Sequence, residues 1–194
     1  RILLILMVAY LIFYMFRMTK DKKNIEGFTQ KKKFELRTNN DIYDNFYSDI
    51  YDKIMYDKNK LDYEIEELTN LTKMNKKSTI LDIGSGNGHH VGALYNAGMN
   101  AVGIDLSKYM VEISKKKYPN CYFKTGDIMK SFDGHKELYT HVLCMYFTIY
   151  YIEDKTAFFK KCYKLLKSKG FLVIHLVDRN NFDPMISLSN PLLI

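Results

Sequence analysis

The sequence predicts an α/β fold with a doubly wound, Rossmann-like and mostly parallel sheet. From residue 79 onward, short β-prone runs alternate with amphipathic helical segments, which is the pattern of βαβ units with right-handed crossovers. The first β-prone run ends in a cluster of glycines, where α/β sheets commonly turn toward a bound ligand. The 194 residues are enough for one such domain with its own hydrophobic core.

Five strands are expected, each from a short run rich in β-branched or aromatic residues. Their predicted ranges are 79–83, 100–105, 121–124, 141–146 and 171–177. Two helices should precede the first strand, because residues 42–55 place paired apolar side chains at every fourth position and a second apolar stripe follows. This second stripe consists of Leu61, Ile65, Leu68 and Leu71. Ser107 and Asp154 are good N-caps for two later helices, and Gly98 should end another.

The end of the first strand is the expected ligand site. In open α/β sheets, ligands bind beyond the carboxyl ends of the strands, and glycines there allow a sharp turn and a close approach. Asp105 follows Asp82 by 23 residues and stands at the end of the second strand. A carboxylate at this point suits the two hydroxyls of a ribose. Together, the glycines and Asp105 predict a cofactor that contains adenosine.

The spacing of the glycines argues against a dinucleotide. A dinucleotide fingerprint reads G-x-G-x-x-G, but here His89 occupies the third glycine position and Gly88 comes one residue early. Asp82 stands just before the glycines, where its charge would repel a pyrophosphate but attract an ammonium group. An NAD-dependent oxidoreductase is therefore the less favoured alternative.

Three motifs in order resemble the class I S-adenosylmethionine-dependent methyltransferases. They are LDIGSGNG at 81–88, GIDLS at 103–107 and GDI at 126–128. The resemblance covers roughly residues 41–178 and implies transfer of a methyl group from S-adenosyl-L-methionine. A catalytically inactive methyltransferase-like binding module is the other alternative.

The resemblance also implies which residues bind the cofactor. Gly84, Ser85, Gly86 and Gly88 match the loop beneath the amino-acid part of S-adenosylmethionine, and Asp82 matches the acid that supports this loop and the ammonium group. The remaining matches fall into four groups: Asp105 for the ribose and Leu106 for the adenine; Asp127 and Ile128 beside the adenine; Cys144, Met145 and Tyr146 between cofactor and acceptor; and Tyr47 and Tyr51 in a tyrosine-rich lid segment.

No catalytic base follows from the sequence. His89 and His90 open the helix after the glycines, where partial exposure is expected. His141 and His175 lie in predicted strands and are interpreted as hydrogen-bonded core residues, although His175 could face the cleft. The acceptor is expected to be a small molecule or a lipid. Neither an Asn-Pro-Pro-Tyr nor an Asp-Pro-Pro-Tyr motif follows the fourth strand, which argues against methylation of the amino groups of nucleic-acid bases.

The two ends of the chain lead to further expectations. Residues 1–18 hold an unbroken apolar run followed by basic residues, which predicts a single-pass membrane anchor in contact with lipids, with the domain on the cytoplasmic side. Residues 19–40 are interpreted as a basic linker. Residues 179–194 are too few for the last two strands of the family sheet, so we expect a truncated chain or an edge completed by other means.

The charge distribution argues against a nucleic-acid partner, and the cysteine spacing argues against disulfides and a metal site. The net charge is +7, but residues 41–194 hold 20 basic and 19 acidic residues, so the domain itself is nearly neutral. A nucleic-acid-binding domain usually carries its own basic face, which makes such a partner improbable here. The three cysteines are scattered through apolar runs and are interpreted as reduced core residues without a disulfide or metal.

Overall fold

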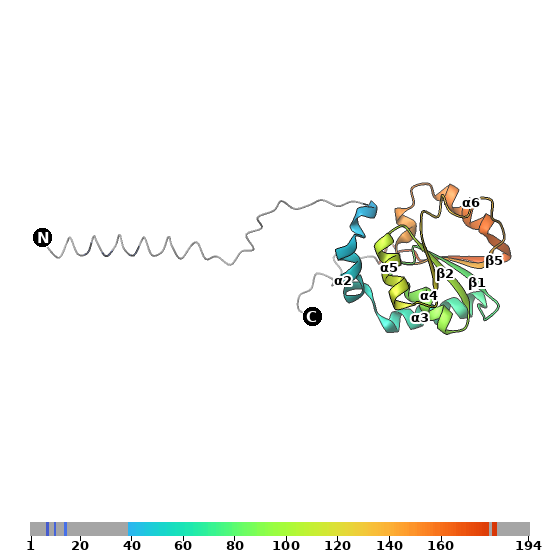
Figure 1. Ribbon diagram of the computed structural model, residues 1–194, viewed down its shortest axis with the longest axis horizontal. Coiled ribbons are helices and arrows are strands. Elements are labelled where there is room, and N and C mark those ends of the chain that lie inside the picture. The colour runs from blue at the N-terminus through green and yellow to red at the C-terminus, as the bar shows by residue number, and fades with distance from the viewer. Residues whose placement is uncertain (1–6, 8–9, 11–13, 15–38, 179, 182–194) are drawn as a thin grey trace. The chain divides into compact units, whose positions relative to one another are not determined.

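The computed structural model describes residues 39–178 together with Met7, Tyr10, Tyr14, Asn180 and Asn181 (Figure 1). The chain divides into two units, residues 1–36 and 37–194, and every helix and strand named below belongs to the second. The elements in chain order are η2 (Asn39–Ile42), α2 (Asn45–Met55), α3 (Lys58–Thr72), β1 (Thr79–Ile83), α4 (His89–Asn96), β2 (Asn100–Asp105), α5 (Lys108–Lys117), β3 (Tyr122–Thr125), β4 (Tyr139–Cys144), η3 (Thr148–Tyr151), α6 (Lys155–Leu165) and β5 (Leu166–Ile174).

The five strands form one parallel sheet in the order β3-β2-β1-β4-β5. From β1 the chain moves outward to β2 and β3, then returns to the other side of β1 for β4 and β5. The carboxyl ends of β1 and β4 therefore meet where the winding reverses, which is where open α/β sheets bind ligands. The predicted fold class is confirmed for the domain.

Each face of the sheet is covered by helices, as a doubly wound sheet requires (Figure 1). Ile80 of β1 packs with Leu94 of α4 and Val111 of α5 on one face. Leu81, its neighbour in the chain, packs with Phe158 of α6 on the opposite face. Successive strand residues point to opposite faces, so one short apolar strand can contribute to both cores.

Helix starts are set by capping side chains. Asp44 Oδ1 accepts a hydrogen bond from Tyr47 N at 2.8 Å, so α2 begins at Asn45 rather than at the start of the apolar stripe. Ser107 accepts from Met110 N at 3.3 Å, and Asp154 accepts from Ala157 N at 2.9 Å. The N-caps predicted for α5 and α6 are thus confirmed.

Several details of the predicted elements differ from the structure, beginning with β3, which spans Tyr122–Thr125 rather than 121–124. Leu71 is 73% exposed, because Thr72 takes the buried position that continues the stripe of α3. Strand β4 spans Tyr139–Cys144 rather than 141–146. Strand β5 begins at Leu166, which pairs with Tyr139, and residues 167–170 then bulge out before Phe171 pairs with His141. The regular part of β5 ends at Ile174, before the predicted 177.

The predictions for the chain ends fall outside the described residues. Apart from Met7, Tyr10 and Tyr14, the predicted anchor at 1–18 and nearly all of the linker at 19–40 belong to the part left undescribed, as do residues 179 and 182–194. Within the described part, no helix has the length and apolar character needed to cross a bilayer. Also within that part, β5 pairs only with β4.

Candidate cofactor-binding and active site

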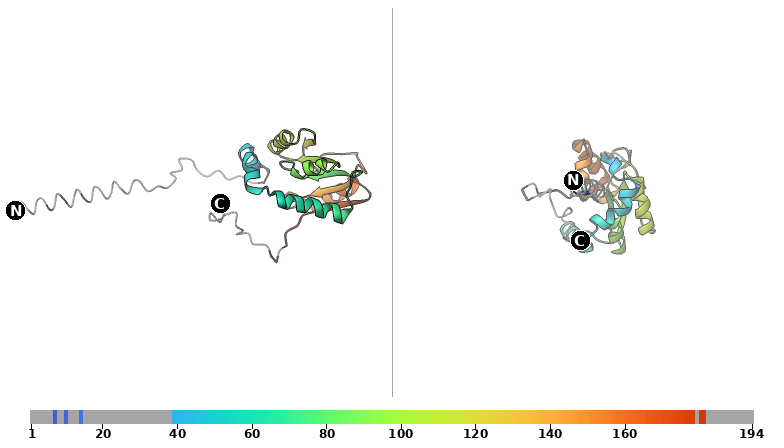
Figure 2. Two further views of the ribbon diagram at one scale, coloured as in Figure 1. Left: turned by 90° about the horizontal axis from the view of Figure 1, so that it is seen from below. Right: turned by 90° about the vertical axis from the view of Figure 1, so that its left-hand side faces the viewer.

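A cavity of about 640 Å³ opens at the carboxyl ends of β1, β2 and β4, a volume in the range of small-molecule sites. Its walls come from the segment after each of these strands and from α2, which lies beside α5 at one end of the sheet (Figure 2). Twelve of the fourteen predicted cofactor residues line it: Asp82, Gly84, Ser85, Gly86, Asp105, Leu106, Asp127, Ile128, Met145, Tyr146, Tyr47 and Tyr51. Binding by these residues stays a prediction.

The glycine loop, residues 84–88, forms the floor. Gly84, Gly86 and Gly88 have φ angles of 70°, 52° and 84°, a region that side chains with a Cβ rarely adopt. A Cβ on Gly84 would collide with the side chain of Thr148, which follows β4. Glycine at position 84 therefore lets the loops after β1 and β4 touch beneath the cavity.

Gly88 and Cys144 do not line the cavity, contrary to the sequence-based assignment. A Cβ on Gly88 would lie 2.7 Å from Phe123 Cζ and 2.8 Å from Ser114 Cβ, so this glycine lets α4 pack closely on β3 and α5. Cys144 is fully buried against α6 with Phe158 and Cys162. Its side chain points to the face of the sheet opposite to that of Leu143.

Asp82 is the buried acid of the site. Its residue is 1% exposed, it lines the cavity, and no side chain or backbone group of the described residues hydrogen-bonds to its Oδ1. Burial raises the pKa of this carboxyl to about 6, a rise that the nearby His90 counteracts and Asp105 reinforces. An unpartnered buried carboxylate oxygen fits a cationic ligand group, such as the ammonium of S-adenosylmethionine.

Asp105, at the end of β2, is held by backbone N–H groups. Its Oδ2 accepts from Gly86 N and its Oδ1 from Ser107 N, both at 2.8 Å. Burial raises its pKa, and the hydrogen bonds from Ser107, Gly86 and Leu106 only partly counteract this. The carboxylate thus joins the glycine loop to the start of α5 and stands at the cavity wall, where a ribose is expected.

Asp127 and Ile128 border the cavity after β3. Asp127 Oδ1 accepts from Met129 N at 2.9 Å, which fixes the turn that presents both residues. Ile128 is buried in the core beside α6. One polar and one apolar group at this wall suit the edge and face of an adenine, as the resemblance implies.

Four tyrosines form a lid, named here the tyrosine lid: Tyr43, Tyr47 and Tyr51 near and within α2, and Tyr151 in η3. Tyr43 Oη donates to Tyr151 Oη at 3.1 Å. The rings of Tyr47 and Tyr51 meet edge to face with centroids 5.8 Å apart. The sequence analysis predicted Tyr47 and Tyr51 as ligands in a lid segment, but it missed Tyr151, which is far away in the chain.

Asp52 fastens the lid to the glycine loop. Its Oδ1 accepts from Asn87 Nδ2 at 2.7 Å and lies 3.0 Å from His89 Nε2, and its Oδ2 forms an ion pair with Lys117 of α5. Burial lowers the pKa of His89 to about 4, so this ring is neutral at physiological pH. Asp52 could not be predicted from the sequence, because its partners lie on three other segments.

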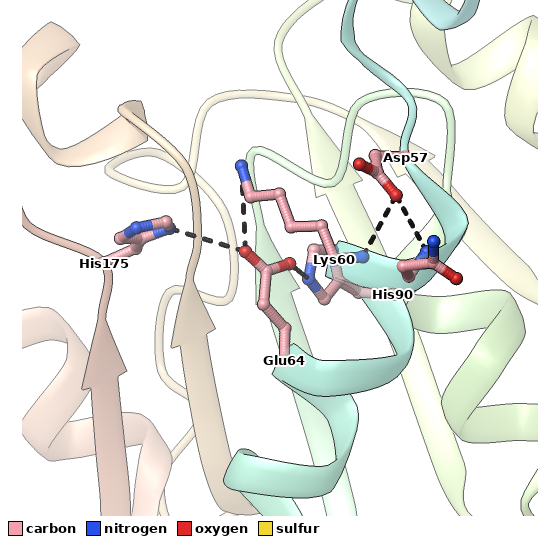
Figure 3. A network of polar contacts seen from close by, with 6 residues as sticks. Asp57, Lys60, Glu64, His90 and His175 are labelled. Carbon is pink, nitrogen blue, oxygen red and sulfur yellow. Dashed lines mark hydrogen bonds and ion pairs between the residues drawn. The ribbon is translucent and has the colours of Figure 1, made fainter.

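A second polar group lies beside the cavity. Glu64 of α3 contacts Lys60, His90 and His175, a set named here the Glu64 cluster (Figure 3). His90 is 6% exposed, whereas partial exposure was expected, and it lines the cavity. His175 follows β5 and does not line the cavity.

His141 is buried against Phe171 with its Nδ1 2.8 Å from Thr140 Oγ1, as expected of a core residue.

Comparison with known protein families identifies a methyltransferase, as the three sequence motifs predicted. The sequence profile of the methyltransferase domain family matches residues 80–170, the segment from β1 into β5 that carries all three motifs. The chain carries a class I S-adenosylmethionine-dependent methyltransferase domain. The expected family is thereby confirmed.

Curated relatives of this methyltransferase include two quinone-modifying enzymes. Demethylmenaquinone methyltransferase of Chlorobaculum tepidum is 30% identical over 109 residues, which is 54% of this chain and 44% of that protein. The enzyme of the same name from Chlorobaculum parvum is 29% identical over 108 residues, with the same shares of both chains. The chain thus spans less than half the length of these relatives.

Solved methyltransferase structures share the fold. A protein from Methanococcus maripaludis that is described as an S-adenosylmethionine-dependent methyltransferase has a TM-score of 0.60 at 22% identity over 74% of this chain and 67% of its own. Phosphoethanolamine N-methyltransferase 2 of Haemonchus contortus, solved with S-adenosylhomocysteine and phosphomonomethylethanolamine, has a TM-score of 0.60 at 20% identity, over 75% of this chain and 38% of its own.

Proposed function

We propose that this chain binds S-adenosylmethionine and transfers its methyl group to a small hydroxylated aromatic or lipid-like acceptor. One observation carries the proposal: residues from all three motifs meet in one cavity, where Asp82 offers a buried, unpartnered carboxylate oxygen. Three acids from three strand ends match the three polar parts of the cofactor. They are Asp82 for the ammonium, Asp105 for the ribose and Asp127 for the adenine.

The protein's own part in the reaction is alignment and exclusion of water. Bound S-adenosylmethionine would supply a methyl group already activated by its sulfonium, so positioning contributes most of the remaining catalysis. The glycine loop and Asp105 hold one side of the site, and the tyrosine lid covers it. Asp52 and the Tyr43–Tyr151 hydrogen bond keep this lid closed at both ends of α2.

The acceptor is inferred from the rest of the cavity wall and from the relatives. Met55, Leu61, Met145 and Phe147 line the cavity with apolar surface, which favours an aromatic or lipid-like molecule. The Chlorobaculum relatives are named for a demethylated menaquinone, which is a lipid-soluble aromatic acceptor. We therefore place the acceptor among naphthoquinol-like compounds.

The same proposal includes membrane attachment. Residues 1–18 would anchor the chain in a bilayer, and the basic residues that follow would keep the domain on the cytoplasmic side. A membrane anchor is consistent with a lipid-soluble acceptor, because it would hold the domain near the bilayer in which such an acceptor dissolves.

Calorimetric titration of the full chain with S-adenosylmethionine and, separately, with NAD tests the cofactor. We expect saturable binding of S-adenosylmethionine and none of NAD; the reverse result would favour the oxidoreductase alternative. Binding of neither would contradict the proposal.

Turnover is tested with the full chain in lipid nanodiscs that contain demethylmenaquinol and a methyl-labelled donor. The expected result is label in the lipid fraction and an equal amount of S-adenosylhomocysteine. Tight cofactor binding without any S-adenosylhomocysteine, across a screen of aromatic and lipid acceptors, would instead favour an inactive binding module.

A further inference from the structure

We propose that His90 is the general base of the reaction, that Glu64 positions it, and that the acceptor is deprotonated at an acidic aromatic hydroxyl before methyl transfer. This inference rests on the proposed function, because it needs an acceptor in the cavity. It supplies the catalytic base that the sequence left unassigned, and it narrows the acceptor to a phenol- or naphthol-like class.

The position of His90 makes it available to an acceptor. It is the second residue of α4 and follows directly on the glycine loop. The residue lines the cavity although it is only 6% exposed, so it borders the ligand space and is nearly closed to bulk solvent. A buried imidazole in a cavity that also binds substrate is well placed for proton transfer.

Glu64 fixes the orientation of the His90 ring (Figure 3). His90 Nε2 lies 3.0 Å from Glu64 Oε2, and Glu64 is only 9% exposed. A carboxylate accepts but does not donate, so a neutral His90 must carry its proton on Nε2 and its lone pair on Nδ1. In catalytic triads, too, a carboxylate binds one ring nitrogen of the histidine and leaves the other free to accept a proton.

The charge of Glu64 is maintained by its surroundings. Burial acts to raise the pKa of this carboxyl, but the hydrogen bond and charge of His90, with Lys60 and His175, lower it below its usual value. Lys60 Nζ and His175 Nδ1 each lie 3.9 Å from Glu64 Oε1. An ionised Glu64 stabilises the imidazolium that forms when His90 takes a proton.

Tyr146 marks the side of the cavity where the acceptor would lie. This lining residue has a left-handed φ of 50°, a strained conformation that clusters at functional sites. Its ring lies between those of His90 and His175, with centroids 5.8 and 6.0 Å away, and Lys60 Nζ stands 4.2 Å above it. The ring thus offers an aromatic wall beside the proposed base.

The other titratable groups near His90 are less suited to the role. Burial raises the pKa of Tyr146 to about 12, so its hydroxyl stays protonated. His89 also lines the cavity, but burial lowers its pKa to about 4, which makes it a weak base, and its Nδ1 lies 2.8 Å from Tyr118 Oη. Among the described residues, the ionisable groups that interact with His90 include Glu64, Asp82, His89 and Tyr146, while Lys60 and His175 contact the same Glu64 carboxylate.

Proton transfer to His90 and methyl transfer from the sulfonium together make up the proposed reaction. Nδ1 of His90 takes the hydroxyl proton, and the electron pair left on the acceptor forms the new bond to the methyl carbon. The carbon–sulfur bond breaks, its electron pair stays on sulfur, and the positive charge of the sulfonium disappears. His90 then releases its proton to solvent, so one acceptor gains a methyl group and one proton leaves.

The test uses 1-naphthol, an aromatic hydroxyl compound whose ionised form has a distinct absorbance. The full chain in nanodiscs, saturated with S-adenosylhomocysteine, is titrated with 1-naphthol over a range of pH. We expect the bound naphthol to ionise at a pH at least about one unit lower with the native chain than with His90→Gln. Glu64→Gln should remove part of this shift. His135→Gln, at an exposed histidine outside the cavity, should remove none.

A second readout does not need the acceptor. Nitrogen-15 chemical shifts of the labelled histidines, with His90 assigned from its variant, report which ring nitrogen carries the proton. We expect the Nε2–H form in the native chain and its loss in Glu64→Gln but not in Glu66→Gln, an exposed position on the same helix.

The outcomes separate this inference from the proposed function. An unchanged ionisation pH in His90→Gln, an Nδ1–H tautomer in the native chain, or no binding of 1-naphthol would overturn the inference while S-adenosylhomocysteine still binds. Failure of the native chain to bind S-adenosylhomocysteine would instead refute the proposed function. If His90→Gln cannot bind S-adenosylhomocysteine, the tautomer measurement on Glu64→Gln decides.

Discussion

Ionisation of the Asp82 carboxyl lowers the stability of the ligand-free protein, and the same ionised group is the one that we propose binds the cofactor. Its folded-state pKa of about 6 exceeds the ordinary value of 3.8, so folding favours the protonated carboxyl. Stability from this group is therefore fully present below about pH 4 and is lost as the pH rises through about 6. At neutral pH the carboxyl is mostly ionised, and under the proposed function it would then bind the ammonium group of the cofactor.

The first prediction follows for Asp82→Asn. At neutral pH this variant should stabilise the ligand-free protein by on the order of 3 kcal/mol, because about two pKa units of unfavourable ionisation disappear. The same variant should bind S-adenosylmethionine far more weakly. Thermal unfolding at pH 4.5 and 7.5, with calorimetry, checks both effects. A stability gain that is equal at the two pH values would show that ionisation of Asp82 is not its cause.

Asp105 provides the second prediction. Asp105→Ala should weaken S-adenosylmethionine binding by about 2–4 kcal/mol, because a charged acceptor for the ribose is lost. The glycine loop also loses the bond from Gly86 N. Dissociation constants from calorimetry test this, with the exposed Asp133→Ala as the control. An unchanged constant would remove Asp105 from the binding site.

Sequence motifs located most of the site, because its glycines and acids follow strand ends that local patterns reveal. They could not show the direction of a side chain within a buried strand. Cys144 was therefore placed at the cavity although it packs on α6. Nor could they pair Glu64 with His90, since the two lie on different helices and only tertiary packing brings them to 3.0 Å.

At the scale of elements, Asp52 makes the shorter of two contacts between α2 and the glycine loop, since Asn87 Nδ2 also donates to Ser48 O at 3.4 Å. Asp52 contacts Asn87 and His89 in and after that loop, and Lys117 at the end of α5. These partners lie on segments that also line the cavity, where we propose that the cofactor binds. Helix α2 and the cofactor should therefore stabilise one another.

The third prediction is that Asp52→Ala loosens α2. Losing its contacts should cost about 2 kcal/mol, which corresponds to roughly 30-fold faster amide exchange in α2 and faster dissociation of S-adenosylmethionine. Hydrogen exchange and stopped-flow measurements check this. Asp49→Ala, at an exposed position of the same helix, is the matched control. Equal exchange in the two variants would disprove the attachment.

Element boundaries were predictable where a local signal sets them. Ser107 and Asp154 cap their helices as expected, because a cap needs only the next three residues. The start of β5 was missed, because Leu166 joins the sheet through Tyr139, a partner far away in sequence. The apolar stripe of α3 was continued to Leu71 rather than Thr72, because hydrophobicity alone does not show that a threonine can be buried.

At the scale of the whole molecule, the fourth prediction concerns attachment to membranes. Residues 1–18 should keep the full chain in the membrane fraction through high-salt and alkaline washes, because burial of apolar surface is insensitive to ionic screening. Deleting these residues should release the domain. Release of the full chain by salt alone would point to electrostatic attachment through the basic residues at 20–33. Protease protection should place the domain on the cytoplasmic side.

The closed tyrosine lid has a consequence for the order of catalytic events. Tyr43 donates to Tyr151 in the segment after β4, and Asp52 holds the other half of α2. A cofactor against the glycine loop would lie beneath this closure, so we expect an ordered sequential mechanism with S-adenosylmethionine first on and S-adenosylhomocysteine last off. Product-inhibition kinetics should show S-adenosylhomocysteine competing with S-adenosylmethionine but not with the acceptor. The concentration of donor would then decide what fraction of the protein is able to bind an acceptor at all.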